Sequence, residues 1–254
     1  MIHPDRCFDV DPTVRRAARE LYESTRSLPI VSPHGHVEAR ILATNEAFEN
    51  PTALLVTPDH YVLRMLYARG VSLESLGVPR RDGAPVQSDP RAIWRLFAQH
   101  FSVFRATPSG MWLDHELHDL FGVRVRLAED NADGVYDAIA EKLASPEFRP
   151  RALFERFDIE VLATTDLASD TLEHHTALKR SGWKGRVIPT FRPDSIFRLT
   201  APGWRQAVNA LATTIGAPIG DYDALVDALA ERRTFFKWMG ATASDHGVVE
   251  PYTT

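Results

Sequence analysis

Four apolar segments of this chain each end in polar, chemically reactive side chains, and helical patterns separate them. The polar ends are His34 and His36, then Thr165 and Asp166, then Arg192 and Asp194, and finally Asp245 and His246. Strands that alternate with helices are typical of a parallel sheet with right-handed crossovers. In parallel barrels the reactive groups lie at the carboxyl ends of the strands, which is where these side chains fall. The pattern therefore predicts an α/β protein with a functional site along one edge of its sheet.

The first of these segments, residues 29–38, carries two histidines one residue apart. Its apolar run indicates a buried strand, and alternate residues of an extended chain point to one side, so His34 and His36 can face one point. Neutral imidazole is a common zinc ligand, and Gly35 lets the backbone bend toward an ion. The single Cys7 leaves histidine and carboxylate as the metal ligands. Two hydrogen-bonded polar residues at a strand end are the alternative, because two ligands do not complete a metal site.

Helical patterns precede the first strand and fill the stretch between the first and second strands. Asp11 and Pro12 suit the start of an amphipathic helix over residues 11–26. Aromatic residues then recur at helical spacing without a strand signal, which is more typical of a core than of a cofactor site. We predict an N-terminal helix and first strand in residues 1–39, a helical insertion in 40–150, and strands 2–4 of an incomplete barrel in 151–254.

The last of these parts alternates strands with helices. Helices are predicted over residues 171–181, 204–214 and 222–232, and the apolar run from residue 235 predicts the fourth strand.

Charge and composition limit the partners of the protein. A net charge of -5 without a basic stripe argues against nucleic acid. No apolar run has the length of a membrane span, and the N-terminus lacks the pattern of a signal peptide, so we expect no membrane partner. Together with the unpaired Cys7, these features predict a cytoplasmic protein.

Seven short motifs occur in a fixed order along the chain. They are His34-Gly35-His36, Asp59-His60-Tyr61 with Arg64, Trp112-Leu113-Asp114-His115-Glu116-Leu117 before Leu120-Phe121-Gly122, Thr164-Thr165-Asp166, Leu172-Glu173-His174-His175, Phe191-Arg192-Pro193-Asp194, and Ser244-Asp245-His246. In this order they resemble the uronate (glucuronate) isomerases, a branch of the amidohydrolase superfamily of metal-binding (β/α)8 TIM barrels. The resemblance runs from about residue 20 to the end of the chain. It implies the first four or so β/α units of such a barrel, with a helical insertion after strand 1.

The resemblance also implies a reaction and a set of site residues. The reaction is the aldose-ketose isomerisation of a hexuronate, glucuronate to fructuronate or galacturonate to tagaturonate, by proton transfer between C2 and C1. One divalent metal, usually zinc, is implied on His34 and His36, and a homo-oligomer is expected for the full-length protein. The resemblance assigns catalysis to Tyr61, Asp245 and His246, and substrate binding to Arg192, His60 and Asp166.

Several of these assignments have structural alternatives. Tyr61 and His60 can instead be packing neighbours at a helix start. Arg192 can simply pair with Asp166 or Asp194, and Asp245 with His246 can orient a ligand rather than react. We expect His174 and His175 to cap or pair at the surface of a helix. The functional alternatives are a metal-dependent hydrolase and a half-barrel that binds a sugar acid without turnover.

The family's chains are nearly twice as long as these 254 residues. The second half would supply further groups, including a histidine after strand 5 and an aspartate after strand 8. Four strands alone would leave unpaired edges and an exposed apolar face. We therefore expect the sequence to be the N-terminal half of a longer protein, active only with its second half.

Overall fold

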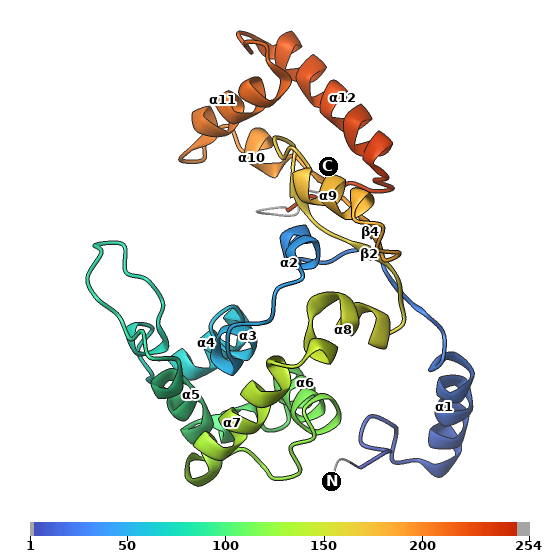
Figure 1. Cartoon of the computed structure of the whole chain (residues 1–254), viewed down its shortest axis with the longest axis vertical. Helices are drawn as coiled ribbons and strands as arrows, with labels where there is room; N and C mark the ends of the chain where they lie inside the picture. The colour runs from blue at the N-terminus through green and yellow to red at the C-terminus, as the bar shows by residue number, and fades with distance from the viewer. Residues whose placement is uncertain (1–2, 248–254) are drawn as a thin grey trace. The chain divides into compact units, whose positions relative to one another are not determined.

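The structure, a computed structural model, describes residues 3–247 and divides into two compact units (Figure 1). Unit 1 comprises Met1–Leu28 and Glu46–Ala152, and unit 2 comprises Pro29–Asn45 and Leu153–Thr254. The segment that carries His34 and His36 therefore belongs with the last part of the chain, although the whole helical stretch of unit 1 separates them in the sequence.

Unit 1 contains helices and no strand among its described residues. Its helices are α1 (Pro12–Thr25), α3 (Pro51–Leu55), α4 (His60–Ala68), α5 (Pro90–Gln99), α6 (Pro108–His115) and α7 (Ala132–Leu143), with short turns η1 (Glu74–Leu76), η2 (Phe101–Phe104), η3 (Glu116–Leu120), η4 (Glu129–Asn131) and η5 (Pro146–Phe148). Helix α8 (Pro150–Arg156) follows at the boundary with unit 2. Trp94, Phe97 and Phe104 are fully buried in the core of unit 1. The indole N–H of Trp94 donates to the carbonyl oxygen of Ala132 over 2.9 Å, so the core leaves no unpaired donor there.

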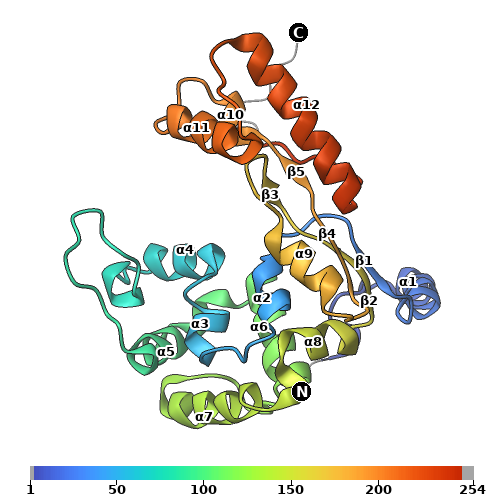
Figure 2. The same ribbon diagram turned by 45° about the horizontal axis from the view of Figure 1, so that its top comes forward.

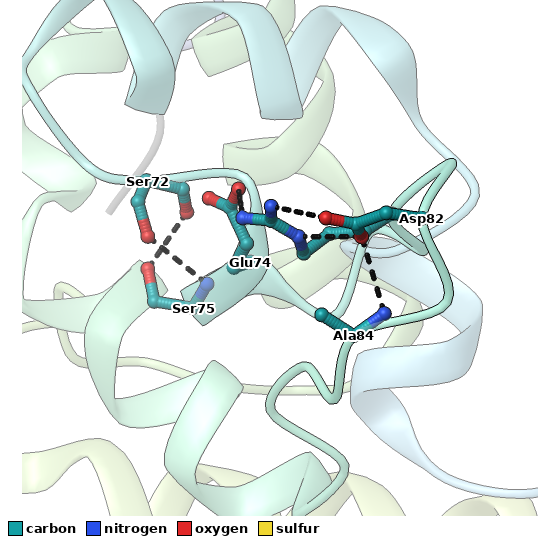
Figure 3. A network of polar contacts seen from close by, with 6 residues as sticks. Ser72, Glu74, Ser75, Asp82 and Ala84 are labelled. Atoms are coloured by element: carbon teal, nitrogen blue, oxygen red, sulfur yellow. Dashed lines mark hydrogen bonds and ion pairs between the residues drawn. The ribbon is translucent and has the colours of Figure 1, made fainter.

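The predicted N-terminal helix is confirmed in unit 1. Helix α1 begins after Asp11, whose carboxylate accepts hydrogen bonds from the backbone of Thr13 and Val14. The polar stretch before α5 is a surface connection whose side chains pair with one another (Figure 3). In it, Arg80 donates to both carboxylate oxygens of Asp82 and lies 3.1 Å from Glu74.

Unit 2 is built on short parallel strands that neighbour one another in chain order. Strand β2 (Ile159–Ala163) lies between β1 (Ile30–Ser32) and β4 (Arg186–Ile188), as Figure 2 shows. Beyond two intervening residues, β3 (Asp166–Leu167) continues from β2 and pairs in parallel with β5 (Phe191–Arg192). Phe191 in turn forms a parallel bridge with Ser244. The predicted α/β class with a parallel sheet is therefore confirmed.

The helices of unit 2 pack through three clusters of buried apolar residues, of which two include strand residues. The helices of unit 2 are α2 (Ala39–Thr44), α9 (Glu173–Arg180), α10 (Asp194–Phe197), α11 (Trp204–Ile215) and α12 (Tyr222–Met239). The cluster nearest the first strands joins α2 and α9 to the sheet through Leu42, Leu178 and Leu162. Such burial is the main stabilising contribution available to the unit, at roughly 25 cal/mol per Å² of apolar surface. No helix in the described part of the chain is both long and apolar enough to cross a membrane.

The fourth predicted strand is wrong over most of its length. Residues 235–239 continue helix α12, which begins after the N-cap Asp221 and ends at Gly240 with a φ of 105°. Phe236 and Met239 are buried three residues apart on one face of this helix. A run of five residues with four apolar side chains fits either structure, and here the helical spacing prevails. Only the polar end, at Ser244, meets the sheet.

The prediction of a buried first strand is also wrong for these residues. Ile30 is 48% exposed and Val31 is 56% exposed. Within residues 3–247, β1 pairs with β2 alone, so its other edge is open. The apolar face predicted for an unclosed sheet is therefore present at β1.

Candidate functional site

The two histidines after β1 converge on one point. Their Nε2 atoms lie 3.2 Å apart, and their rings stand nearly perpendicular at 86°. Both side chains are exposed. Without an ion, one imidazole can donate a hydrogen bond to the other at this distance, which is the structural alternative for the pair.

The backbone between the histidines is held against the neighbouring strand. Thr165, which follows β2, donates a hydrogen bond of 2.7 Å from its Oγ1 to the carbonyl oxygen of Gly35. A Cβ at Gly35 would approach the carbonyl oxygen of Ala163 to 3.3 Å, so the absence of a side chain allows the close packing. The turn that carries His34 and His36 is thus positioned by the carboxyl end of β2.

The geometry of the histidine pair fits two ligands of one ion. Zinc–nitrogen distances of about 2.0–2.1 Å and a tetrahedral angle place two ligand nitrogens about 3.3–3.4 Å apart. The observed separation between His34 and His36 is 3.2 Å. Among residues 3–247 no group of three histidine, cysteine or carboxylate side chains could hold a metal. The described residues therefore supply two candidate ligands and no complete metal centre.

Asp166 lies at the start of β3 in a buried hydrogen-bonded chain. Its Oδ2 accepts a hydrogen bond of 2.6 Å from Thr164, whose hydroxyl also lies 2.9 Å from Nε2 of His175. Burial raises the pKa of Asp166 to about 6, against the lowering effect of the hydrogen bond from Thr164. Burial lowers the pKa of His175 to about 4. Asp166 therefore keeps its proton to a higher pH than an ordinary carboxyl group does.

The expected surface position of the two helix histidines is wrong for His175. Its side chain is 2% exposed and belongs to the chain that reaches Asp166. His174 is partly exposed and lies 3.7 Å from Glu173, as expected for a surface pair. The spacing of three residues from Leu172 to His175 to Leu178 is the signal that could have indicated burial, because the two leucines at the N-cap and in α9 are buried as well.

A cavity of about 300 Å³ links the histidine turn to this buried chain. His36, Asp166 and His175 all line it. Asp170 and His174 add further polar groups to its wall. A cavity with a few converging polar groups is the usual form of a small-molecule site.

A second cluster surrounds Arg192 at the end of β5. Its Nε donates to Oδ2 of Asp194 over 2.8 Å, and its Nη1 lies 3.0 Å from Oδ2 of Asp245. That Asp245 oxygen is buried, and the ion pair with Arg192 lacks the alignment of a hydrogen bond. Although burial opposes the change, hydrogen bonds from Gly247 and Arg192 lower the pKa of Asp194. The pairing of Arg192 with Asp194 that sequence reasoning held open is thus observed.

His246 lies beside the same cluster. Its ring stacks on Phe197 with centroids 5.8 Å apart, and its Nδ1 lies 3.8 Å from Oδ1 of Asp194. Because Leu167 and Arg192 are partners in the β3–β5 pair, the Asp166 and Arg192 groups lie on neighbouring strands. The structure thus gathers Asp166, Arg192, Asp245 and His246 at strand ends of one unit, as the pattern of apolar segments predicts.

His60 and Tyr61 belong to unit 1, at the start of α4. Asp59 caps this helix and accepts a hydrogen bond of 2.7 Å from the backbone N–H of Tyr61. The two rings lie 4.2 Å apart between centroids, and the side chain of Tyr61 is half exposed rather than packed into a core. Their roles in catalysis and substrate binding stay predictions.

Known proteins match the chain along nearly its whole length. A family model for glucuronate isomerase matches residues 12–254. The uronate isomerase of Nostoc punctiforme is 52% identical over 100% of this chain and 54% of its own, and that of Brucella canis is 48% identical over 97% and 53%.

Solved structures agree with the sequence matches. The crystal structure of glucuronate isomerase from Caulobacter crescentus has 45% identity and a TM-score of 0.93, over 97% of this chain and 51% of that one. The uronate isomerase structure from Thermotoga maritima has 28% identity and a TM-score of 0.86, over the same shares of 97% and 51%. The chain spans about half the length of the curated relatives it matches. On these matches, the chain belongs to the glucuronate (uronate) isomerase family.

Proposed function

We propose that this chain provides the N-terminal half of a uronate isomerase active site, which interconverts a hexuronate aldose with its 2-keto isomer. Glucuronate to fructuronate and galacturonate to tagaturonate are the two proposed reactions. The observation that carries the proposal is the convergence of His34 and His36 at the end of β1, where their Nε2 atoms are 3.2 Å apart. Membership of the isomerase family supports it.

We further propose that unit 2 forms the first four or so β/α units of a (β/α)8 barrel. The parallel order of the strands supports this architecture. The parallel bridge between Phe191 and Ser244, where a fourth strand would follow, supports it as well. So does the open edge of β1, because a closed barrel leaves no strand edge unpaired.

We propose one divalent metal ion, in the first instance zinc, on His34 and His36. Their Nε2 separation suits this ion, and further ligands would come from outside the described residues. When bound, the ion would supply positive charge for the enediolate oxygens that develop during isomerisation. Thr165 contributes by holding the Gly35 carbonyl, which fixes the turn between the two ligands.

The remaining site residues suit the proton transfers of the reaction. Moving a carbonyl from C1 to C2 requires a base at C2, an acid at C1 and stabilisation of negative charge on oxygen. We assign proton transfer to Tyr61, with Asp245 and His246 completing the catalytic set. Arg192 would bind the uronate carboxylate, because a guanidinium matches a carboxylate in bidentate geometry.

Two further residues are proposed to bind the sugar. Asp166 lines the cavity beside His36, and its carboxyl group can hydrogen-bond a sugar hydroxyl there. We assign the same role to His60 of α4.

We further propose a homo-oligomeric state and a cytoplasmic location. The free and exposed Cys7 supports the cytoplasmic location.

A chimaera tests the proposed function directly. Residues 1–254 would be fused to the segment that follows the matching half in the Nostoc punctiforme uronate isomerase, which is 52% identical here. Ketose formation from glucuronate and galacturonate is the expected result, and the same chimaera with His34→Ala is the control. A chimaera that forms no ketose but releases an acid or amine from an ester or amide would support the hydrolase alternative instead.

A further inference from the structure

We propose that His175 is a positioning residue, which acts through the hydroxyl of Thr164 to fix the hydrogen bonding and orientation of Asp166 at the cavity beside His36. The hydrogen-bonded chain stands on the geometry of unit 2 alone. Its consequence for catalysis rests on the proposed isomerase function.

The three groups come from separate elements and meet in the interior. Thr164 follows β2, Asp166 begins β3 and His175 lies on α9. Thr164 is 1% exposed, and the side chains of His175 and Asp166 are 2% and 11% exposed. With so little water available, each polar atom depends on its protein partners for hydrogen bonds.

The single hydroxyl proton of Thr164 links the states of the other two groups. Its Oγ1 lies 2.6 Å from Oδ2 of Asp166 and 2.9 Å from Nε2 of His175, both closer than its third partner, the carbonyl oxygen of Ile188 at 3.3 Å. When Asp166 is ionised, the hydroxyl donates to the carboxylate, so Nε2 of His175 must carry a proton and donate to the hydroxyl. When Asp166 is protonated, it donates to the hydroxyl, which then donates to a bare Nε2. The tautomer of His175 therefore follows the charge on Asp166.

The surroundings keep His175 neutral while Asp166 titrates. Burial lowers the pKa of His175 to about 4, and burial raises the pKa of Asp166 to about 6. The ring therefore exchanges one nitrogen-bound proton for the other without gaining charge. The charged and titratable groups that face this chain or share its cavity are Asp170, His174, Lys179, His36, Glu38 and Arg40.

The hydrogen-bonded chain lies next to the turn that carries His34 and His36. Thr165, between Thr164 and Asp166, holds the carbonyl oxygen of Gly35. Three successive residues thus connect the interior histidine, the histidine turn and the cavity wall. A carboxyl group held this way faces a bound substrate with its hydrogen-bonding pattern already set, which lowers the cost of organising the site.

Nitrogen NMR on the 254-residue chain tests the proposal without any assay of activity. The ring signals of His175, identified by their loss in His175→Asn, are expected to show Nε2–H at about pH 7.5 and Nδ1–H at about pH 5, in step with titration of the Asp166 carboxyl carbon. Thr164→Ser keeps the hydroxyl and should keep this exchange, whereas the nearly isosteric Thr164→Val should abolish it. An unchanged tautomer in the native chain, or an exchange that survives Thr164→Val, would overturn the proposal.

Steady-state kinetics of the chimaera test whether this hydrogen-bonded chain affects the reaction. Thr164→Val should lower kcat by about 10- to 100-fold with little change in KM and shift the acid limb of the pH profile, while Thr164→Ser should restore both. A loss in Thr164→Val that Thr164→Ser does not restore contradicts the positioning role. If the chimaera forms no ketose at all, the isomerase function fails, and the NMR result still decides the hydrogen-bonded chain.

Discussion

Thr165 donates a hydrogen bond of 2.7 Å to the carbonyl oxygen of Gly35, a residue 130 positions earlier in the chain. This bond joins the turn after β1 to the end of β2, and it lies between the two candidate metal ligands. The position of His34 and His36 therefore depends on a residue outside their own motif.

Thr165→Val should disturb the histidine turn more than the fold. Loss of one hydrogen bond is expected to cost about 1 kcal/mol of unfolding free energy, because a partly buried carbonyl loses its donor. Zinc affinity should fall by about 10- to 100-fold, as is typical when a group that orients metal ligands is removed. Calorimetric zinc titration beside urea unfolding measures both. Thr165→Ser is the matched control, and a Val variant with native zinc affinity would contradict the role given to Thr165.

Removal of either candidate ligand should reduce metal binding. His34→Ala and His36→Ala are each expected to lower the zinc bound per chain in the chimaera, because each removes one of the two converging nitrogens. Elemental analysis after dialysis provides the measurement. Arg192→Ala is the matched control and should retain its zinc, since a guanidinium is not a metal ligand. Native zinc content in both histidine variants would exclude the pair as ligands.

Arg192 has a binding role only if its loss affects the substrate more than the fold. Arg192→Ala in the chimaera should raise KM for glucuronate by at least tenfold, and Arg192→Lys should raise it less, because lysine keeps the charge but not the bidentate geometry. Steady-state kinetics with thermal unfolding separate the possibilities. A variant with lower stability but an unchanged KM would mean that Arg192 serves only to pair with Asp194 and Asp245.

Opposite pKa shifts should leave opposite marks on stability. Burial raises the pKa of Asp166 to about 6, so its folded form binds a proton more tightly than the unfolded chain, and its contribution to stability is lost as pH rises from about 4 to 6. The pKa of His175 is lowered to about 4, so its contribution to stability is gained as pH rises from about 4 to 6.5. Each contribution is at most about 3 kcal/mol, and in the native chain they largely cancel.

The variants should expose the two contributions one at a time. In urea unfolding, Asp166→Asn should gain stability between pH 4.5 and 6.5, and His175→Asn should lose it, each by on the order of 1–3 kcal/mol relative to the native chain. Identical pH profiles for the two variants would show that both shifts are absent.

Helix α12 offers a matched pair for its packing. Phe236 is fully buried, with its ring centroid 5.1 Å from that of Phe191, whereas Trp238 is 76% exposed. Phe236→Ala should cost about 3–5 kcal/mol of unfolding free energy, and Trp238→Ala less than about 0.5 kcal/mol. Chemical unfolding measures the difference. Equal costs would contradict the helix, because residues two apart lie on one face of a strand but on nearly opposite faces of a helix.

The sequence allowed prediction of the strand ends but not of all that surrounds them. Polar residues after apolar runs gave the positions of His34, Asp166 and Arg192, because parallel strands bring their carboxyl ends to one edge. The run at residues 235–239 was assigned incorrectly, since a short, mostly apolar run fits a strand or a helix until its neighbours are known. The burial of His175 was missed, although its spacing of three residues from the apolar Leu172 and Leu178 indicates the buried face of the helix.

The assignment of β1 to unit 2 also bears on the order of folding during synthesis. Ile30 pairs with Ile159, so the first strand emerges from the ribosome long before its partner exists. All of Glu46–Ala152 is made in the interval and can condense on its own core. Contacts between residues so far apart in the sequence form slowly, because closing a long loop costs entropy before the contacts can stabilise it. The histidine turn should therefore become ordered late, once Thr165 has emerged to hold it.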